Sequence, residues 1–127
     1  MKRVNDFLTE WVNAVNKKDL NKIISFYADE AVLVPTFSNI ILNSPEKIKD
    51  YFTKLLSRKE LSCGIHQKTI NTNSAAENVY IVDGIYFFRF AVDEEPLTFE
   101  ARFSIIADFK RKKPIIHHHS SQIPRLL

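Results

Sequence analysis

Two neighbouring segments near the C-terminal end carry side chains that can transfer a proton or hold a negative charge. His117, His118 and His119 lie in one β-patterned segment, and Arg102 lies in the segment before it. An imidazole can accept or donate a proton near neutral pH, and a guanidinium can bind a carboxylate through its planar fork. Arg102 alternates with polar neighbours such as Glu100, so the periodicity favours a solvated face for it, with an interior position as the alternative.

The histidine triplet also has a metal-binding alternative. On a strand, His117 and His119 share one face and His118 points to the other. Only two of the three histidines could bind the same metal ion, and a third ligand would have to come from His66 or an acidic residue. The sequence therefore favours no metal site. It predicts no cofactor either, because two glycines are too few for a glycine-rich phosphate loop.

Four aromatic residues with polar atoms fall at interior positions of the periodic pattern, namely Trp11, Tyr27, Tyr51 and Tyr86. Ordinary core packing is the usual role of such residues. A buried hydroxyl or indole N–H nevertheless needs a partner, and in a hollow fold that partner is often water or a ligand. Tyr27 is expected at the end of a second helix, near the mouth of a pocket, and is the first candidate.

No carboxylate stands out as a general base. Asp29, Glu30 and Asp83 lie near apolar runs, but each fits a turn or a cap. The single cysteine, Cys63, fits a small core residue, permits no internal disulfide and suits a reducing compartment. The basic run over residues 110–113 fits a solvated hairpin turn.

Two periodicities divide the chain into helices followed by strands. Helical spacing predicts a helix over residues 3–17, a short one capped by Asp19, and a third beginning at Ser44-Pro45. Strand patterns cover residues 31–37, 39–42, 61–71, 78–92, 97–109 and 115–121, with a bend at Asp83-Gly84 and a turn over residues 93–96. Three helices closing the concave face of a curled antiparallel or mixed sheet predict a cone-shaped α+β fold with one pocket.

Length and composition set the remaining limits. The 127 residues predict one domain over 1–127, and 45% hydrophobic with 26% charged residues is a globular composition. A net charge of +3 does not indicate nucleic acid, and no apolar run reaches membrane-spanning length. We therefore expect a cytoplasmic protein without nucleic-acid or membrane partners.

Three motifs resemble those of a known superfamily. They are the segment from Ile115 to Ser121 with the later Pro124, the tripeptide Ala101-Arg102-Phe103, and the stretch from Asn13 to Leu20. Together with the element order, they resemble the nuclear transport factor 2-like superfamily. Within it, the chain is most similar to the association domain of calcium/calmodulin-dependent protein kinase II and its small stand-alone bacterial (SnoaL-like) relatives. That domain has a cavity-lining arginine where this chain has Ser120.

The resemblance implies an interior site and a homodimer. Its ligand-binding residues would be Arg102, His118, Ser120, Tyr27, Trp11, Tyr86 and Tyr51. The ligand would be a small mono-anionic or polar aromatic molecule. With Arg102 inside, strict alternation would turn the Phe99, Phe103 and Ile105 face outward, where a second copy would cover it.

Two functions follow from the resemblance, because the superfamily contains both enzymes and assembly modules. One is a module for small-molecule binding or self-assembly. The alternative is an isomerase, dehydratase or cyclase. In that enzyme His118 would shuttle the proton, and Arg102 or Tyr27 would stabilise the developing oxyanion.

Overall fold

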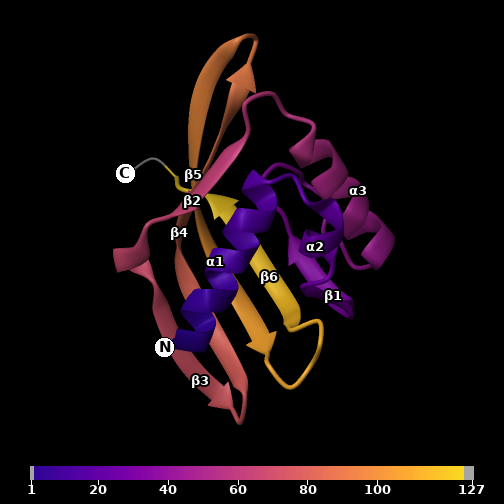
Figure 1. The fold of residues 1–127 in the computed structure, drawn as a ribbon, viewed down its shortest axis with the longest axis vertical. Coiled ribbons are helices and arrows are strands. Elements are labelled where there is room, and N and C mark those ends of the chain that lie inside the picture. Colours follow the sequence, from indigo (N-terminus) through magenta and orange to yellow (C-terminus); the bar gives the residue numbers. More distant parts are fainter. Residues whose placement is uncertain (1, 125–127) are drawn as a thin grey trace.

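The computed structural model describes residues 2–124 and has three helices on one face of a six-stranded curved sheet (Figure 1). The helices are α1 (Lys2–Asn16), α2 (Leu20–Ile24) and α3 (Pro45–Leu56), with a short 3-10 turn, η1 (Gln67–Thr69). The strands are β1 (Tyr27–Val34), β2 (Ser62–Ile65), β3 (Asn71–Ala76), β4 (Val79–Val92), β5 (Glu95–Asp108) and β6 (Ile115–Gln122). The predicted α+β architecture is confirmed. No helix within residues 2–124 is long and apolar enough to cross a membrane.

The helices begin and end close to where their sequence signals indicate. Asp19 caps α2 by accepting a hydrogen bond from the backbone N–H of Lys22 at 3.1 Å. Ser44 caps α3 in the same way through the N–H of Lys47 at 3.3 Å, and Pro45 is the first helical residue. Both caps satisfy amide groups that the first turn of a helix leaves without a partner.

The strands form one sheet in the order β1-β6-β5-β4-β2, and β3 pairs with β4 beyond the end of β2. Only β1 and β6 run parallel among the paired strands of the described chain. The β4–β5 ladder runs without a register shift from Val79–Asp108 to Val92–Glu95. The expected bend at Asp83-Gly84 therefore does not interrupt this ladder. It is the point where β4 changes its edge partner, because β3 pairs up to Asp83 and β2 begins at Tyr86.

Three expected strands differ from the structure. The first strand begins at Tyr27 rather than Ala31, because Tyr27 pairs with Ile115 at the start of β6. The expected strand over 39–42 is reduced to one bridge between Leu33 and Leu42. The expected strand over 61–71 is broken by η1, because β2 and β3 pair with different halves of β4. Each difference depends on which segment a strand pairs with, and the first of these pairings joins segments distant in sequence.

The apolar face of β5 points toward the helices, so the expectation that it faces outward is wrong. Ala101, Phe103, Ile105 and Ala107 are all buried beneath the helices. They share this face with alternate residues of β4, such as Val82 and Tyr86, through the cross-strand pairs. Burying this face under the helix layer, where Trp11 of α1 stacks on Tyr86, removes apolar surface from water without a second copy.

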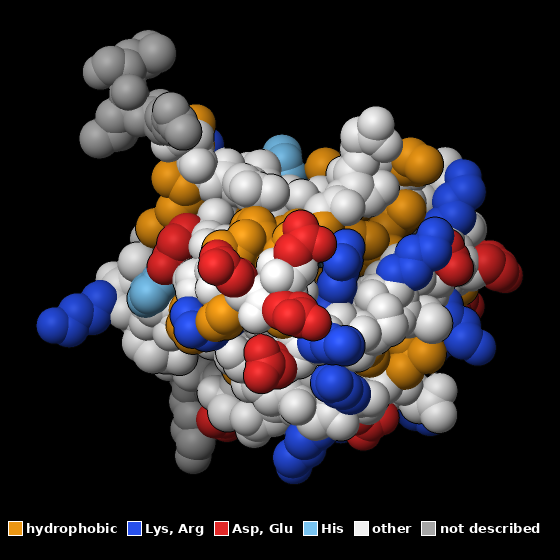
Figure 2. Space-filling view, turned by 90° about the horizontal axis from the view of Figure 1, so that it is seen from above, with side chains coloured by type: hydrophobic (Ala, Val, Ile, Leu, Met, Phe, Trp, Pro, Cys, Tyr) orange, Lys and Arg blue, Asp and Glu red, His pale blue; other side chains and the backbone are white. Residues whose placement is uncertain are grey.

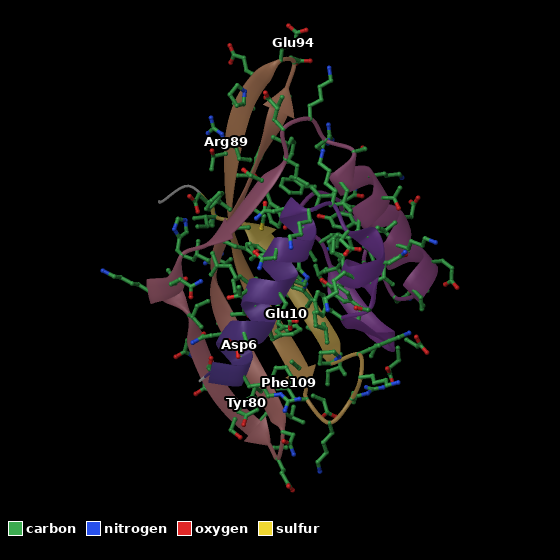
Figure 3. The ribbon with its side chains drawn as sticks, in the orientation of Figure 1. Asp6, Glu10, Tyr80, Arg89, Glu94 and Phe109 are labelled. Atoms are coloured by element: carbon green, nitrogen blue, oxygen red, sulfur yellow. The ribbon has the colours of Figure 1, made fainter. Side chains whose placement is uncertain are left out.

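The β4–β5 hairpin extends beyond the rest of the sheet (Figure 1). Its turn is shorter than expected and consists of Asp93 and Glu94, with φ of 50° and 70°. Both residues adopt the left-handed conformation that a two-residue type I′ hairpin turn requires. Figure 3 shows Glu94 at the tip of this hairpin and Arg89 farther down. At the opposite end of the molecule, the ring of Phe109 packs against Tyr80 with centroids 5.9 Å apart.

Gly84 provides a close approach between β4 and its neighbours. A methyl group at this position would lie 2.9 Å from Cδ1 of Ile70 and 2.9 Å from Cζ of Phe103. We predict that Gly84→Ala lowers the free energy of unfolding by about 1–3 kcal/mol, because overpacking displaces a buried ring. Chemical denaturation measures this loss. The double variant Gly84→Ala/Phe103→Leu should lose less unfolding free energy than the two single variants together, because the shorter leucine relieves the clash. Strictly additive losses would contradict a clash between residue 84 and the Phe103 ring.

Candidate functional site

His118 is the centre of the interior polar site. It lies on β6 opposite Ile105 and Leu33 and is 2% exposed. Its Nδ1 lies 2.8 Å from the hydroxyl of Tyr27, and its Nε2 lies 3.1 Å from the hydroxyl of Tyr86. Both ring nitrogens are therefore held by tyrosines from different strands.

Trp11 fixes the direction of hydrogen bonding around His118. Its indole N–H donates to the Tyr27 hydroxyl oxygen at 3.2 Å. The hydroxyl of Tyr27 is then available to donate to Nδ1 of His118, which leaves the ring proton on Nε2 facing Tyr86. The arrangement forms one chain from Trp11 through Tyr27 and His118 to Tyr86, and it assigns a neutral Nε2–H tautomer.

Burial determines the protonation states of this chain. Burial, with smaller contributions from the neighbouring His117 and His119, lowers the pKa of His118 to about 3. Burial also raises the pKa of Tyr27 and Tyr86 well above the ordinary value. A neutral imidazole between two neutral phenols is the stable state at pH 7, because ionising any of them would place a charge in an apolar interior.

Ser120 extends the polar chain toward the loop after β1. Its hydroxyl is hydrogen-bonded to the hydroxyl of Thr36, and it is 3% exposed. Ser120 and Thr36 also lower the pKa of Tyr86 against the larger effect of burial. Every buried side-chain nitrogen and oxygen in the described part of the chain has a hydrogen-bond partner. The interior polar groups are therefore satisfied without a ligand.

The cavity beside His118 is small. It has a volume of about 10 Å³ and is lined by residues that include Trp11, Thr36, Tyr51, His118 and Ser120. A cavity of this size holds about one water molecule. Toward solvent, the ring of Phe37 packs edge-on against Phe88, Phe90 and Phe99 at 5.3–5.6 Å. These rings close the interior at this end.

Arg102 lies outside this site, so the expected interior position is wrong. Its side chain is exposed, and its cross-strand partners are Ser121 and Ile85 on the face that points away from the helices. The reason is the alternation of β5, in which Ala101 and Phe103 point inward. Periodicity alone had favoured this solvated face.

The other nominated residues meet at the interior site. Trp11, Tyr51, Tyr86, His118 and Ser120 line the cavity, and the buried Tyr27 lies behind it, hydrogen-bonded to Trp11 and His118. Tyr27 reaches the site from the start of β1, not from the end of a helix. Burial raises the pKa of Tyr51 to about 12, and its hydroxyl accepts a long hydrogen bond of 3.4 Å from the backbone N–H of Phe37.

Two residues of this site were missed by the sequence reasoning. Thr36 contacts Ser120, and Phe37 closes the interior toward solvent. Both follow Pro35, and neither belongs to a motif. The parallel pairing of β1 with β6 brings them there, because Leu33 opposite His118 carries the loop past Ser120. That pairing has no local signal in the sequence.

His117 and His119 point to the other face of β6, as the strand alternation predicted. They pair with Val32 and Val34 of β1, and His119 is exposed. No group of three or more potential metal ligands occurs within residues 2–124. Cys63 is buried, and burial raises its pKa to about 12, so its thiol remains protonated at neutral pH.

Comparison with known proteins agrees with this fold. Residues 1–124 match the family model of the calcium/calmodulin dependent protein kinase II association domain. A candidate association domain of this type from Xanthomonas campestris is 25% identical, with a TM-score of 0.86 over 98% of this chain and 88% of that one. No curated protein matches the chain in sequence.

More distant structures share the fold alone. A candidate scytalone dehydratase from Novosphingobium aromaticivorans has a TM-score of 0.84 at 5% identity, over 98% of this chain and 84% of that one. A candidate dehydratase of the NTF2-like family from Streptomyces avermitilis has a TM-score of 0.80 at 10% identity, over 98% and 97% of the two chains. The architecture is therefore the nuclear transport factor 2-like fold, which hosts unrelated functions.

Proposed function

Because the chain belongs to the calcium/calmodulin-dependent protein kinase II association domain family, we propose that it is a self-assembly module whose copies pair through the sheet. The proposed interface is the outer sheet face, defined as the side of the sheet that points away from α1, α2 and α3. No helix of the described chain covers this face. An uncovered sheet face that carries apolar side chains marks a protein interface.

Half-buried apolar residues carry the proposal. They are Val32, Val34, Ile81, Ile85, Phe87 and Ile106. Cross-strand pairing joins Val32, His117, Ile106 and Ile81 in one row across β1, β6, β5 and β4. Such a row forms a mainly apolar strip, interrupted by His117, that an identical strip can cover by two-fold symmetry. Polar residues of the neighbouring row, such as His119 and Asp83, would supply hydrogen bonds at its edge.

An arginine in the middle of this strip tests the proposal. We predict that the wild-type protein is at least a dimer by size-exclusion chromatography with light scattering, and that Ile106→Arg is a monomer with a native circular dichroism spectrum. Ile41→Arg is the matched control, because Ile41 is 59% exposed and lies on the loop before α3. A monomeric wild type, or an Ile106→Arg variant that assembles normally, would contradict the proposal.

Binding of a small neutral molecule in the interior is the second candidate, supported by the mostly apolar cavity into which His118 and Ser120 bring polar groups; the cavity would have to widen to hold more than a water molecule. The described lining residues include no cation, so the cavity suits a neutral polar ligand better than an anion. Entry would require Phe37 to leave its aromatic neighbours. A thermal-shift screen of small neutral amides and alcohols would test this, with Ser120→Ala as the variant that should lose any stabilisation.

Proton shuttling by His118 receives less support. An efficient general base has a pKa near the operating pH, whereas the pKa of His118 is lowered to about 3. Its two nitrogens are also occupied by Tyr27 and Tyr86. An isomerase or dehydratase using this histidine would have to open the interior and break both hydrogen bonds.

A further inference from the structure

A groove that shares only Tyr51 and Leu55 with the lining of the interior cavity runs between α3 and the loop that precedes it. It has a volume of about 370 Å³, within the roughly 300–1,000 Å³ typical of small-molecule sites. Its apolar lining comes from Phe37, Ile40, Leu42, Leu55 and Phe90. Ile40 is 59% exposed, so its side chain offers apolar surface at the edge of the groove. The apolar lining and this exposed side chain favour an apolar ligand body.

Basic side chains form one border of the groove. Lys47, Lys54 and Arg58 line it at positions that share one side of α3 and the turn that follows. Lys54 is paired with Asp50 at 3.2 Å. Lys47 donates to the side chain of Asn43 at 3.1 Å, and within residues 2–124 neither Lys47 nor Arg58 has a carboxylate at ion-pair distance. Two cations therefore remain for an anion.

Arg58 is the better placed of these two cations. Its guanidinium carbon lies 5.2 Å from the centre of the Phe90 ring, directly beside the apolar lining. Stacking on an aromatic ring restrains the guanidinium, and its planar fork matches a carboxylate. Figure 2, seen from the end of the molecule with the β4–β5 turn, shows blue basic side chains with orange apolar ones between them on the side of α3.

We propose that this α3 groove binds a small amphipathic organic anion, with its acidic head on Arg58 and its apolar body along Phe37, Ile40 and Leu42. One or two negative charges suit the site, because Asp50 disfavours a more highly charged ligand. The stretch of α3 from residue 47 to residue 56, about 14 Å at the helical rise, accommodates an extended alkyl or aryl-alkyl chain. The proposal does not depend on self-assembly or on the interior cavity.

Octanoate is a suitable probe, with 1-octanol as its uncharged counterpart. In a ¹H–¹⁵N NMR titration of the wild-type protein, octanoate should perturb residues of the loop over 37–42 and of α3 and should bind more tightly than octanol. Arg58→Gln should lower the affinity for octanoate by about threefold to tenfold and leave the affinity for octanol unchanged. This is the loss expected for one partly exposed ion pair. Ile40→Ser should lower the affinity for both probes.

The control is Lys49→Gln, an exposed lysine of the same helix that does not line the groove. Its octanoate affinity should equal that of the wild type. The assembly variant Ile106→Arg should also retain the affinity, so the groove and the interface can fail independently. Equal affinity for octanol and octanoate, an Arg58→Gln variant with wild-type affinity, or perturbations centred on His118 would overturn the proposal.

Discussion

Lowering the pH from 6.5 to 4.5 is expected to destabilise the protein by about 2 kcal/mol through His118 alone. The pKa of this imidazole is about 3 in the folded protein, against 6.5 for the free side chain. Between these values the unfolded chain binds a proton that the folded chain does not, so stability falls as the pH falls. Well above pH 6.5 both states are neutral and the effect vanishes. Each pH unit well inside the window contributes about 1.4 kcal/mol, and less near its two ends.

Urea denaturation at a series of pH values measures this effect. The comparison variant is His118→Gln, because an amide can hydrogen-bond to the two tyrosines and does not titrate in this range. It should be less stable than the wild type at pH 7 but should lose less stability on acidification. Carboxylates such as Glu30, whose pKa is lowered mainly by its hydrogen bond with Arg111, contribute to both proteins below pH 4.5 and cancel in the difference. Parallel pH profiles would show that His118 is not buried as a neutral group.

Trp11→Ala is expected to lower the free energy of unfolding by about 3–5 kcal/mol, the cost of deleting a buried aromatic side chain. Trp11 is 2% exposed and stacks on Tyr86 with ring centroids 5.8 Å apart. It also lies edge-on to Phe52, Phe88 and His118. Its removal would leave a hole where α1 meets the sheet, because rings held by several strands cannot collapse into the space.

Trp11→Phe separates packing from hydrogen bonding. It keeps an aromatic ring but removes the N–H that donates to Tyr27, so we expect a smaller loss of about 1–2 kcal/mol. Thr9→Ala, at an exposed position of α1, should remain within about 0.5 kcal/mol of the wild type. Chemical denaturation followed by circular dichroism gives all three values. A Trp11→Ala variant as stable as Thr9→Ala would contradict the central role assigned to this ring.

Local signals predicted the elements that depend on neighbouring residues. The amphipathic stripe of α1, the cap residue Asp19 and the pair Ser44-Pro45 each act within one or two helical turns, and the structure confirms them. The strict alternation of β5 and β6 was equally clear. The family resemblance identified the fold correctly, and it brought His118 and Ser120 into one site before any pairing was known.

Tertiary structure decided which face of each alternating strand is covered by the helices. A strand pattern separates two faces but does not say which is covered, because either assignment satisfies a period of two. The packing of the helix layer covers the Phe103 face, and that choice places Arg102 in solvent. The sequence by itself therefore determined the helices, the faces of the long strands and the fold family. The parallel contact of β1 with β6 placed Tyr27 and Thr36 at the site, because long-range pairing depends on the whole chain and not on local propensity.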